Sequence, residues 1–409
     1  MIQLDGRQIL QRSVHRRRAS IRSEAGGWGL GQLGRMMVSF VLWLAVGQLS
    51  TSFAQAPGML RLGQPDRVLD GDYSRIISVR ELADDRVLFT DERENRLLVG
   101  DFQSGRVTTI SRVGRGPGEY SQVGRLWPLP GDTTAMADRG SRRWLLLRGS
   151  TVVATLPPDT PSPQAASGYG RVLEGISWHG EGLASSYPTT GSGIAGQLVA
   201  VRFSRNGGTL DTVTAAVKRL NERAAVPTTV EPLRSSTARP PGRRPVYSIP
   251  FEAVDHVIMF PDGTIAVVRS GPYQVEWCLK SAPCQSGPIL SERDEPMTRE
   301  KQGVFLAWLT STAGWPPTND LGATADWPVV VPAFIRPPAG LDQSPLVALP
   351  DGRLLVWRTP DTERREGRYD LVDRRGRRVS EVRLPLGHRI VGVGRTSVYV
   401  AAADPDGLQ

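Results

Sequence analysis

LPDGRLLVWR, residues 349–358, is the clearest of five ten-residue stretches that share one pattern. Each starts with an apolar residue, continues with a short turn rich in Asp and Gly, and ends in an alternating apolar segment. This is the pattern of a tight β-hairpin. The other stretches are LADDRVLFTD at 82–91, LPGDTTAMAD at 129–138, WHGEGLASSY at 178–187 and FPDGTIAVVR at 260–269, with a looser sixth copy, VGRTSVYVAAAD, at 393–404.

These hairpins recur at intervals of roughly 40 to 50 residues, a spacing typical of radially repeated sheets. One small sheet cannot bury both of its faces alone, so each must pack against its neighbours. Residues 75–113 and 345–384 show the repeat most fully, because each contains four expected strands joined by turns. The sequence therefore predicts an all-β fold, a six-bladed β-propeller of four-stranded antiparallel blades.

The composition fits one large domain made of short strands. The chain has 409 residues, 39% of them hydrophobic, with ten Trp for a packed core and with 44 Gly and 32 Pro for many turns. We predict a single propeller domain over residues 57–409, with loop insertions near 222–250 and 296–338. In the second insertion Thr298 is expected to cap a short helix, whose apolar face would carry Val304, Phe305, Trp308 and Leu309.

The net charge of +9 does not indicate nucleic-acid binding. Residues 1–56 contain seven Arg and two acidic residues, and so supply five of the nine charges. In the rest of the chain Arg and acidic residues are interspersed, and the basic clusters at 239–244 and 374–378 lie in expected loops, which favours solvated turns. No nucleic-acid partner is expected.

The N-terminal region contains a predicted secretory signal peptide. Arg35 precedes the apolar run 38–46, and Ala54-Gln55-Ala56 provides an A-x-A cleavage site. The apolar run is shorter than the ~20 residues that a membrane-spanning helix needs, so residues 1–56 are interpreted as an N-terminal extension plus signal peptide. We expect a periplasmic or extracellular protein with no permanent membrane span after cleavage.

The only two cysteines, Cys278 and Cys284, flank a turn between two expected strands. Facing positions on antiparallel strands satisfy disulfide geometry, and an oxidising compartment lets the bond persist. A disulfide is therefore predicted. The alternative is a pair of buried free thiols, since this spacing matches no common zinc pattern.

The segment Val113–Tyr120, VGRGPGEY, carries a resemblance to a known group. It is similar to the G-x-G-P-G-E-aromatic turn of bacterial exported six-bladed β-propellers related to the NHL-repeat group. The resemblance covers roughly residues 60–404 and implies a fold and an exported location, without a single activity. Such chains continue into a closing strand, whereas this one stops at 409; either an N-terminal strand near 59–69 closes the ring, or the C-terminus is truncated.

The same turn is the candidate ligand site. Its three glycines allow positive φ, so successive N–H groups could form an anion-holding nest, but no Lys-Ser/Thr follows as in a P-loop. The alternative is a tight crossover between blades in which a glutamate accepts backbone N–H bonds. The candidate ligand-face residues are Gly114, Arg115, Gly116, Pro117, Gly118, Glu119 and Tyr120.

No metal or catalytic site is assigned from the sequence. Three histidines follow residue 56, as a zinc-dependent lyase would need; they are His179, His256 and His388. His388 is expected at the entry to an inner strand and His179 at the opposite turn, so the length of a strand separates their levels by roughly 20 Å. Acidic residues near the expected inner strands could serve a calcium-dependent lactonase, although capping of exposed N–H groups is the commoner role; they are Asp91, Asp138, Glu174 and Asp255. No nucleophile motif is present.

These observations favour non-catalytic binding of a small molecule, glycan, peptide or envelope protein, through one end of the propeller channel. No cofactor is predicted for this function. The alternative is a lactonase or lyase that depends on Ca or Zn. A third interpretation is an interaction module that uses the Arg- and Pro-rich insertion at 222–250.

Overall fold

The computed structural model describes most of the strands and one helix. The residues described are 1–5, 58–62, 64–138, 140–141, 143–156, 172–186, 189–190, 193–194, 199–203, 209–214, 255–270, 272–280, 282–290, 295–313, 329–333, 345–361, 366–385 and 387–402. The predicted signal-peptide core and the insertion at 222–250 lie outside these ranges, and the insertion at 296–338 is described in part.

The chain is a β-propeller with mainly antiparallel sheets. The first two sheets follow the sequence order and are β4 (Ile76–Glu81), β5 (Val87–Asp91), β6 (Arg96–Asp101) and β7 (Arg106–Thr109), then β8 (Leu126–Pro128), β9 (Thr133–Asp138), β10 (Arg143–Arg148) and β11 (Thr151–Leu156). The next two are β12 (Val172–Ile176), β13 (Gly182–Ser186), β16 (Val199–Phe203) and β17 (Thr209–Thr214), then β18 (His256–Met259), β19 (Ile265–Ser270), β20 (Tyr273–Cys278) and β21 (Gln285–Ile289). The short pair β14 (Thr189–Thr190) and β15 (Gly193–Ile194) forms a separate two-stranded sheet.

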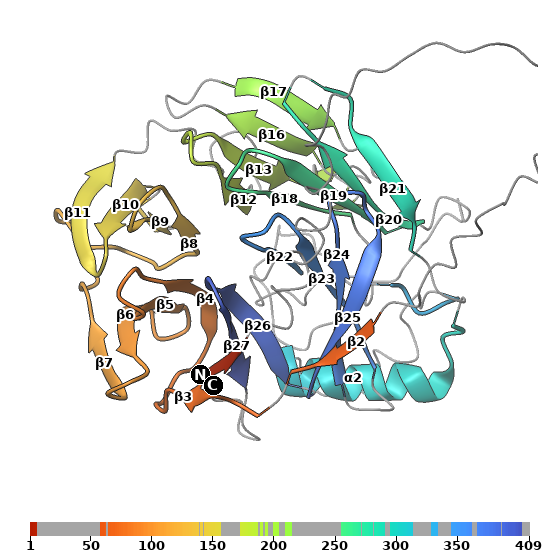
Figure 1. Cartoon of the computed structure of the whole chain (residues 1–409), viewed down its shortest axis with the longest axis horizontal. Helices are drawn as coiled ribbons and strands as arrows, with labels where there is room; N and C mark the ends of the chain where they lie inside the picture. Colours follow the sequence, from red (N-terminus) through yellow and green to blue (C-terminus); the bar gives the residue numbers. More distant parts are fainter. Residues whose placement is uncertain are drawn as a thin grey trace, which may run out of the picture.

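The last two large sheets combine strands from both ends of the chain. One consists of β22 (Leu346–Ala348), β23 (Leu354–Asp361), β24 (Glu366–Val372) and β25 (Arg378–Pro385), with β2 (Gly58–Arg61) added parallel to β25. The other consists of β26 (His388–Val393), β27 (Ser397–Ala402), β1 (Ile2–Asp5) and β3 (Arg67–Val68). Figure 1 shows the N-terminus at this last sheet.

The strand count differs from the six four-stranded blades expected. Among the described residues five sheets have four strands, one has five and one has two. The five-stranded sheet arises because β2 pairs in parallel with the outer strand β25, and sequence periodicity does not register such an addition.

The sheets close around a common centre. The innermost strands contact one another in the order β4, β8, β12, β18, β22 and β26, and β26 contacts β4 again (Figure 1). Within each sheet, one of the repeated sequence stretches joins the innermost strand to the next strand, as predicted. In the clearest copy the Leu349 N–H donates to the Arg353 carbonyl at 2.9 Å, and Gly352 takes a φ of 86° that a side chain would disfavour.

Apolar clusters between adjacent sheets hold the ring together. One cluster joins the first two sheets through Leu82, Leu88, Tyr120, Met136 and Leu145, all almost fully buried. Because both faces of each sheet meet a neighbour, the strands are apolar on both sides rather than strictly alternating.

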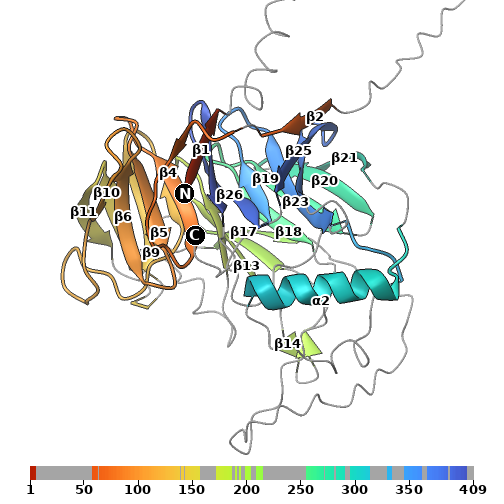
Figure 2. The same ribbon diagram turned by 90° about the horizontal axis from the view of Figure 1, so that it is seen from below.

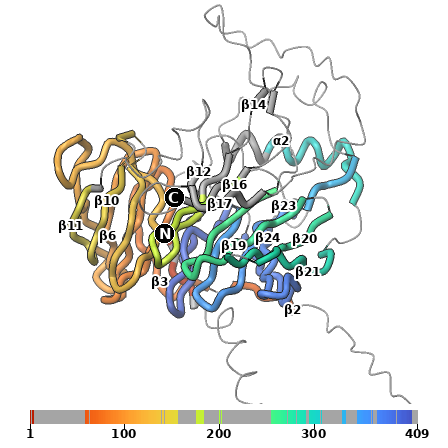
Figure 3. Tube along the Cα trace, turned by 90° about the horizontal axis from the view of Figure 1, so that it is seen from above, coloured from red at the N-terminus to blue at the C-terminus, as the bar shows by residue number. Residues whose placement is uncertain are grey.

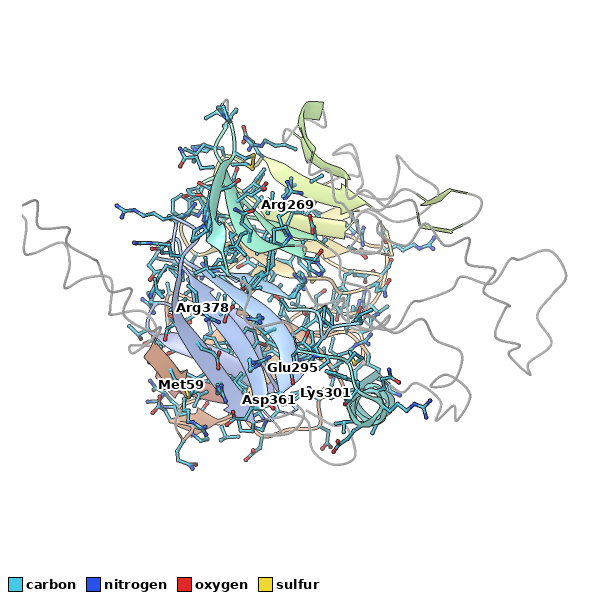
Figure 4. The ribbon with its side chains drawn as sticks, turned by 90° about the vertical axis from the view of Figure 1, so that its right-hand side faces the viewer. Met59, Arg269, Glu295, Lys301, Asp361 and Arg378 are labelled. Carbon is cyan, nitrogen blue, oxygen red and sulfur yellow. A yellow bond between two sulfur atoms is a disulfide. The ribbon has the colours of Figure 1, made fainter. Side chains whose placement is uncertain are left out.

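Helix α2 (Arg299–Ala313) confirms the helix predicted in the second insertion. Thr298 caps it, because its Oγ1 accepts the Lys301 N–H at 3.3 Å. Of the predicted apolar face, Phe305 is 2% exposed and Val304 is 40% exposed, and the side chains of Trp308 and Leu309 lie outside the described residues. The helix and β14 lie on one face of the propeller and β2 on the other (Figure 2, Figure 3). Glu295 and Lys301 form an ion pair at the start of α2 (Figure 4).

The N-terminal residues differ from the predicted extension. Ile2–Asp5 form β1 inside the last sheet, so part of the range 1–56 belongs to the propeller. The strand predicted near 59–69 is present as two short pieces, of which β3 pairs with β1 and β2 pairs with β25. In the described part of the chain no helix has the length and apolarity to cross a membrane.

Candidate functional site

A cavity of about 760 Å³ occupies the centre of the ring. Residues from the innermost strands or their hairpin turns in every large sheet line it, among them Val79, Leu126, Ile176, Ile258, Leu346 and Ile390. This volume is in the range of small-molecule sites, which are commonly concave and largely apolar. The cavity exists because the inner strands of the described sheets converge with their hairpins at one end.

An arginine stacked on two aromatic rings forms part of the hairpin end of the cavity. The Arg374 guanidinium lies 4.3 Å from the ring centre of Phe260 and 4.7 Å from that of Trp277, and it pairs with Asp262 at 2.9 Å. Burial lowers the pKa of Arg374. The solvated turn predicted for 374–378 is therefore wrong at Arg374, whose side chain packs against the neighbouring sheet.

Trp178 stands at the same end with 56% of its surface exposed. The backbone N–H of Trp178 donates to the Pro261 carbonyl at 2.7 Å, which fixes the turn between β12 and β13 against the next hairpin. An exposed indole at a cavity rim offers a flat apolar surface to a ligand.

Arg395, also at the hairpin end, is bound to acidic residues. Its Nε lies 2.9 Å from Glu81 and its Nη2 lies 2.5 Å from Asp85, and the hydrogen bond to Glu81 raises the pKa of Arg395. Tyr399 donates its hydroxyl proton to Glu81 at 2.7 Å, and burial with this contact raises the pKa of Tyr399. This network joins the last sheet to the first and closes the ring.

Arg389 and Arg125 lie where the inner strands begin, at the other end of the cavity. Burial lowers the pKa of Arg389 to about 10, and the positive charges of Arg75 and Arg125 lower it further, while Tyr369 and Glu92 raise it. A guanidinium N–H of Arg389 donates to the Ile76 carbonyl. Arg389 and Arg125 therefore bring two positively charged groups to this end of the cavity lining.

Arg80 contributes a further positive charge to the wall. Its Nη1 donates to the Glu81 carbonyl at 2.5 Å, and within the described part of the chain no carboxylate forms an ion pair with it. Burial lowers the pKa of Arg80, with Asp132 and Glu81 acting in the opposite direction.

The charged lining is therefore mostly cationic. Five arginines line the cavity, at positions 80, 125, 374, 389 and 395, against the two aspartates Asp262 and Asp351. Both aspartates are already paired, Asp262 with Arg374 at 2.9 Å and Asp351 with Arg353 at 2.5 Å. These arginines are far apart in the sequence and could not be predicted to share a site, because only the closed ring brings them together.

The candidate ligand-face turn 113–120 lies outside the lining of this cavity. The Gly116 N–H donates to the Glu119 carboxylate at 2.8 Å, and Arg112 Nε donates to the same group at 2.6 Å. These contacts correspond to the crossover alternative. The turn lines a smaller hollow with residues 109–112, so any ligand role of Gly114–Tyr120 stays a prediction separate from the central cavity.

Three of the acidic residues singled out in the sequence accept hydrogen bonds from the protein itself. Asp91 accepts from the Ser74 and Arg75 N–H groups at 3.2 and 3.0 Å, and Asp138 accepts from those of Ser121 and others. Asp255 accepts from the N–H and hydroxyl of Ser270. None of these three lines the cavity. The Glu174 side chain lies outside the described residues.

The three histidines do not gather in one cluster. His179 is exposed in a hairpin turn, while His256 and His388 begin β18 and β26. Of these only His388 lines the cavity. Among the described residues no set of three or more His, Cys, Asp or Glu side chains is placed to share a metal ion.

The disulfide prediction is confirmed. Cys278 and Cys284 are bonded, with their Cα atoms 4.1 Å apart, across the turn between β20 and β21.

Comparison with known proteins yields fold resemblances only. No family model matches the chain, and no curated protein matches it. Solved structures that resemble it include a calcium-binding regucalcin from Agrobacterium tumefaciens, with 12% identity, TM-score 0.39 and coverage of 81% of this chain and 80% of that one. An exported protein from Bacteroides fragilis has 15% identity and a TM-score of 0.38, and the match covers 80% of this chain and 75% of that one. A virginiamycin B lyase from Staphylococcus aureus has 8% identity and a TM-score of 0.35, and the match covers 78% of this chain and 72% of that one. At these values the resemblances carry no argument about activity, substrate or partner.

Proposed function

We propose that the central cavity binds a small anionic ligand and that the protein acts as an exported, non-catalytic binding module. The observation that carries this proposal is the cavity lining, in which five arginines outnumber two aspartates that are already paired with arginine. Arg374 and Arg395 are themselves paired with carboxylates, so the proposal rests mainly on Arg80, Arg125 and Arg389. The remaining surface is largely apolar, which suits an organic anion such as a carboxylate or sulfonate on a compact hydrophobic body.

The electrostatics of the cavity support an anion. Removing a charge from water costs free energy, and a nearby opposite charge recovers part of it. Burial lowers the pKa values of Arg80 and Arg389 because their charged forms are poorly solvated. An anion in the cavity would be attracted to the nearer of these charges, and the attraction is stronger in this environment than in water.

Arginine is also well suited to recognise such a group. Its planar guanidinium offers donors in a fixed fork that matches carboxylate, sulfonate and phosphate oxygens. The exposed Trp178 at the hairpin end would contact an aromatic or aliphatic part of the same ligand.

The alternative function is a lactonase or lyase that depends on Ca or Zn. A cation would need carboxylate or imidazole ligands in the cavity, whereas the charged lining described above favours anions. Elemental analysis of protein purified without chelator separates the enzyme from the binding module. Stoichiometric Ca or Zn would support the enzyme, whereas no bound metal would favour the binding module.

We infer that the propeller has six blades, as in the NHL-related exported proteins that the sequence resembles. The five-stranded sheet counts as one four-stranded blade, β22 to β25, to which β2 is added along the outer edge. Export is supported by the predicted signal peptide and by the disulfide, because such bonds persist in oxidising compartments.

Two fluorescent probes test the anion proposal. 1-Anilinonaphthalene-8-sulfonate carries a sulfonate, and N-phenyl-1-naphthylamine has the same ring system without it. We expect Arg389→Met to weaken binding of the sulfonate about tenfold or more, since loss of one buried charge contact is worth at least ~1.4 kcal/mol, and to leave binding of the neutral probe unchanged.

The matched control is Arg106→Met, which removes the same charge from an exposed position on the outer strand β7. It should leave both affinities unchanged. Equal sulfonate affinity in the Arg389 variant and the wild type, with both folded as judged by circular dichroism, would contradict the proposal.

A further inference from the structure

The last sheet of the propeller contains one strand, β1, that no short loop connects to the other strands of the sheet. β1 lies between β27 and β3 and pairs with both. Ile2 to Asp5 pair with Val400 to Ser397 in antiparallel register, and Ile2 and Gln3 pair with β3 on the other side. The segment therefore fills a gap between two strands and satisfies backbone groups on both of its edges.

Two side chains anchor this segment in opposite directions. Leu4, 5% exposed, packs with Leu60, Ile390 and Val398 toward the five-stranded sheet. Met1, also 5% exposed, joins the cluster of the first sheet that includes Leu69.

Polar contacts fix the register of the same segment. Gln3 donates its Nε2 proton to the Ser397 Oγ at 3.0 Å. The Asp66 N–H donates to the Gln3 carbonyl at 3.0 Å, and the Leu69 N–H donates to the Met1 carbonyl at 2.7 Å. These contacts hold Met1–Asp5 in an extended register, with the apolar side chains of Met1 and Leu4 at its first and fourth positions.

Only the long stretch 6–57 links β1 covalently to β2. The predicted cleavage after Ala56 falls within this stretch and would separate β1 from the rest of the chain. Without β1, the facing edges of β27 and β3 would expose unpaired N–H and C=O groups beside apolar side chains, which is the arrangement that accepts an added peptide strand.

We propose that the gap between β27 and β3 is a peptide-binding site that accepts an extended segment of the form apolar-x-x-apolar, with Met1–Asp5 as its occupant in the uncleaved chain. The occupant is held by strand pairing and by Met1 and Leu4 rather than by the covalent chain. It is therefore exchangeable once the link is cut. This site is separate from the anion-binding cavity and does not depend on the proposed function.

The test uses the full chain with a specific protease site inserted after residue 30. After cleavage and gel filtration under native conditions, we expect either that the N-terminal fragment co-elutes with the propeller or that it leaves and a fluorescent peptide of sequence MIQLD binds in its place. Unlabelled MIQLD should compete with the labelled peptide.

The matched competitors are the Leu4→Asp and Leu4→Met versions of the peptide. The Asp version should compete about tenfold or more weakly, because it places a charge in an apolar cluster, whereas the Met version keeps the volume and should compete nearly as well. Loss of the fragment on cleavage without uptake of labelled peptide would overturn the proposal, as would equal competition by all three peptides.

Discussion

Asp138 is expected to stabilise the second sheet, and its replacement tests the structural role of the strand-end acids. The carboxylate is fully buried and accepts from the Ser121, Gln122 and Ser141 N–H groups at 3.0, 3.0 and 3.2 Å. It also pairs with Arg143 at 3.1 Å. It therefore ties the chain that enters the sheet to the end of β9.

The cost of removing this carboxylate follows from the groups that it leaves behind. Breaking a buried ion pair by deleting one partner costs about 3 to 5 kcal/mol, and each buried N–H left without an acceptor adds about 1 to 3 kcal/mol. These contributions are not additive, and Arg143 keeps its bonds to the Arg115 and Glu119 carbonyls at 2.9 and 2.7 Å. We expect Asp138→Ala to lower the free energy of unfolding by about 4 kcal/mol.

Chemical denaturation followed by tryptophan fluorescence measures this loss. Asp138→Asn keeps one acceptor oxygen and should lose about half as much as the Ala variant. The control is Asp84→Ala, whose ion pair with Arg86 is exposed and should be worth less than about 0.5 kcal/mol. An Asp138→Ala protein that unfolds at the wild-type midpoint would refute the structural role and revive a ligand role for these acids.

Replacing both Cys278 and Cys284 by Ser is expected to lower the free energy of unfolding by about 2 kcal/mol, because the bond closes only a small loop. Reduction of the wild type should lower its thermal midpoint as much as the double replacement does. Different shifts of the midpoint in the two experiments would contradict this. The affinity for the anionic probe is expected to be constant at moderately alkaline pH and to fall as the pH passes about 10, the lowered pKa of Arg389. The sign follows because the guanidinium is charged below its pKa, while the sulfonate stays ionised throughout. A fluorescence titration at each pH measures it, and a flat profile through pH 11 would show that Arg389 does not contact the probe.

Local patterns in the sequence predicted the hairpins because the turn and strand signals lie within ten consecutive residues. The stretch at 349–358 needs only its Asp-Gly turn and its apolar alternation to form a hairpin. The disulfide and the helix start at Thr298 were predictable for the same reason, since each depends on residues close together in the chain.

The cavity could not be predicted in the same way. Arg80 and Arg389 lie on the first and last innermost strands, and only closure of the ring brings both into its lining. The available signal was weak: Arg80 and Arg389 each lie on an expected inner strand, where a charged side chain must face a neighbour or the centre. Sequence analysis instead selected Gly114–Tyr120, whose glutamate is bonded within its own turn.

The N-terminal strand was missed for a related reason. Residues 2–5 are too few for a periodicity signal, and they precede an apolar run typical of a leader. Their role depends on pairing with Ser397–Val400 at the far end of the chain.

The most direct test of the anion-binding cavity is a crystal structure of the protein grown with 4-bromobenzenesulfonate, with the bromine located by its anomalous signal. The account predicts bromine density inside the central cavity, with the sulfonate in hydrogen-bond reach of Arg389, Arg125 or Arg80. Bromine density only on the outer surface of the propeller, from crystals grown with the ligand well above the dissociation constant measured in solution, would contradict it.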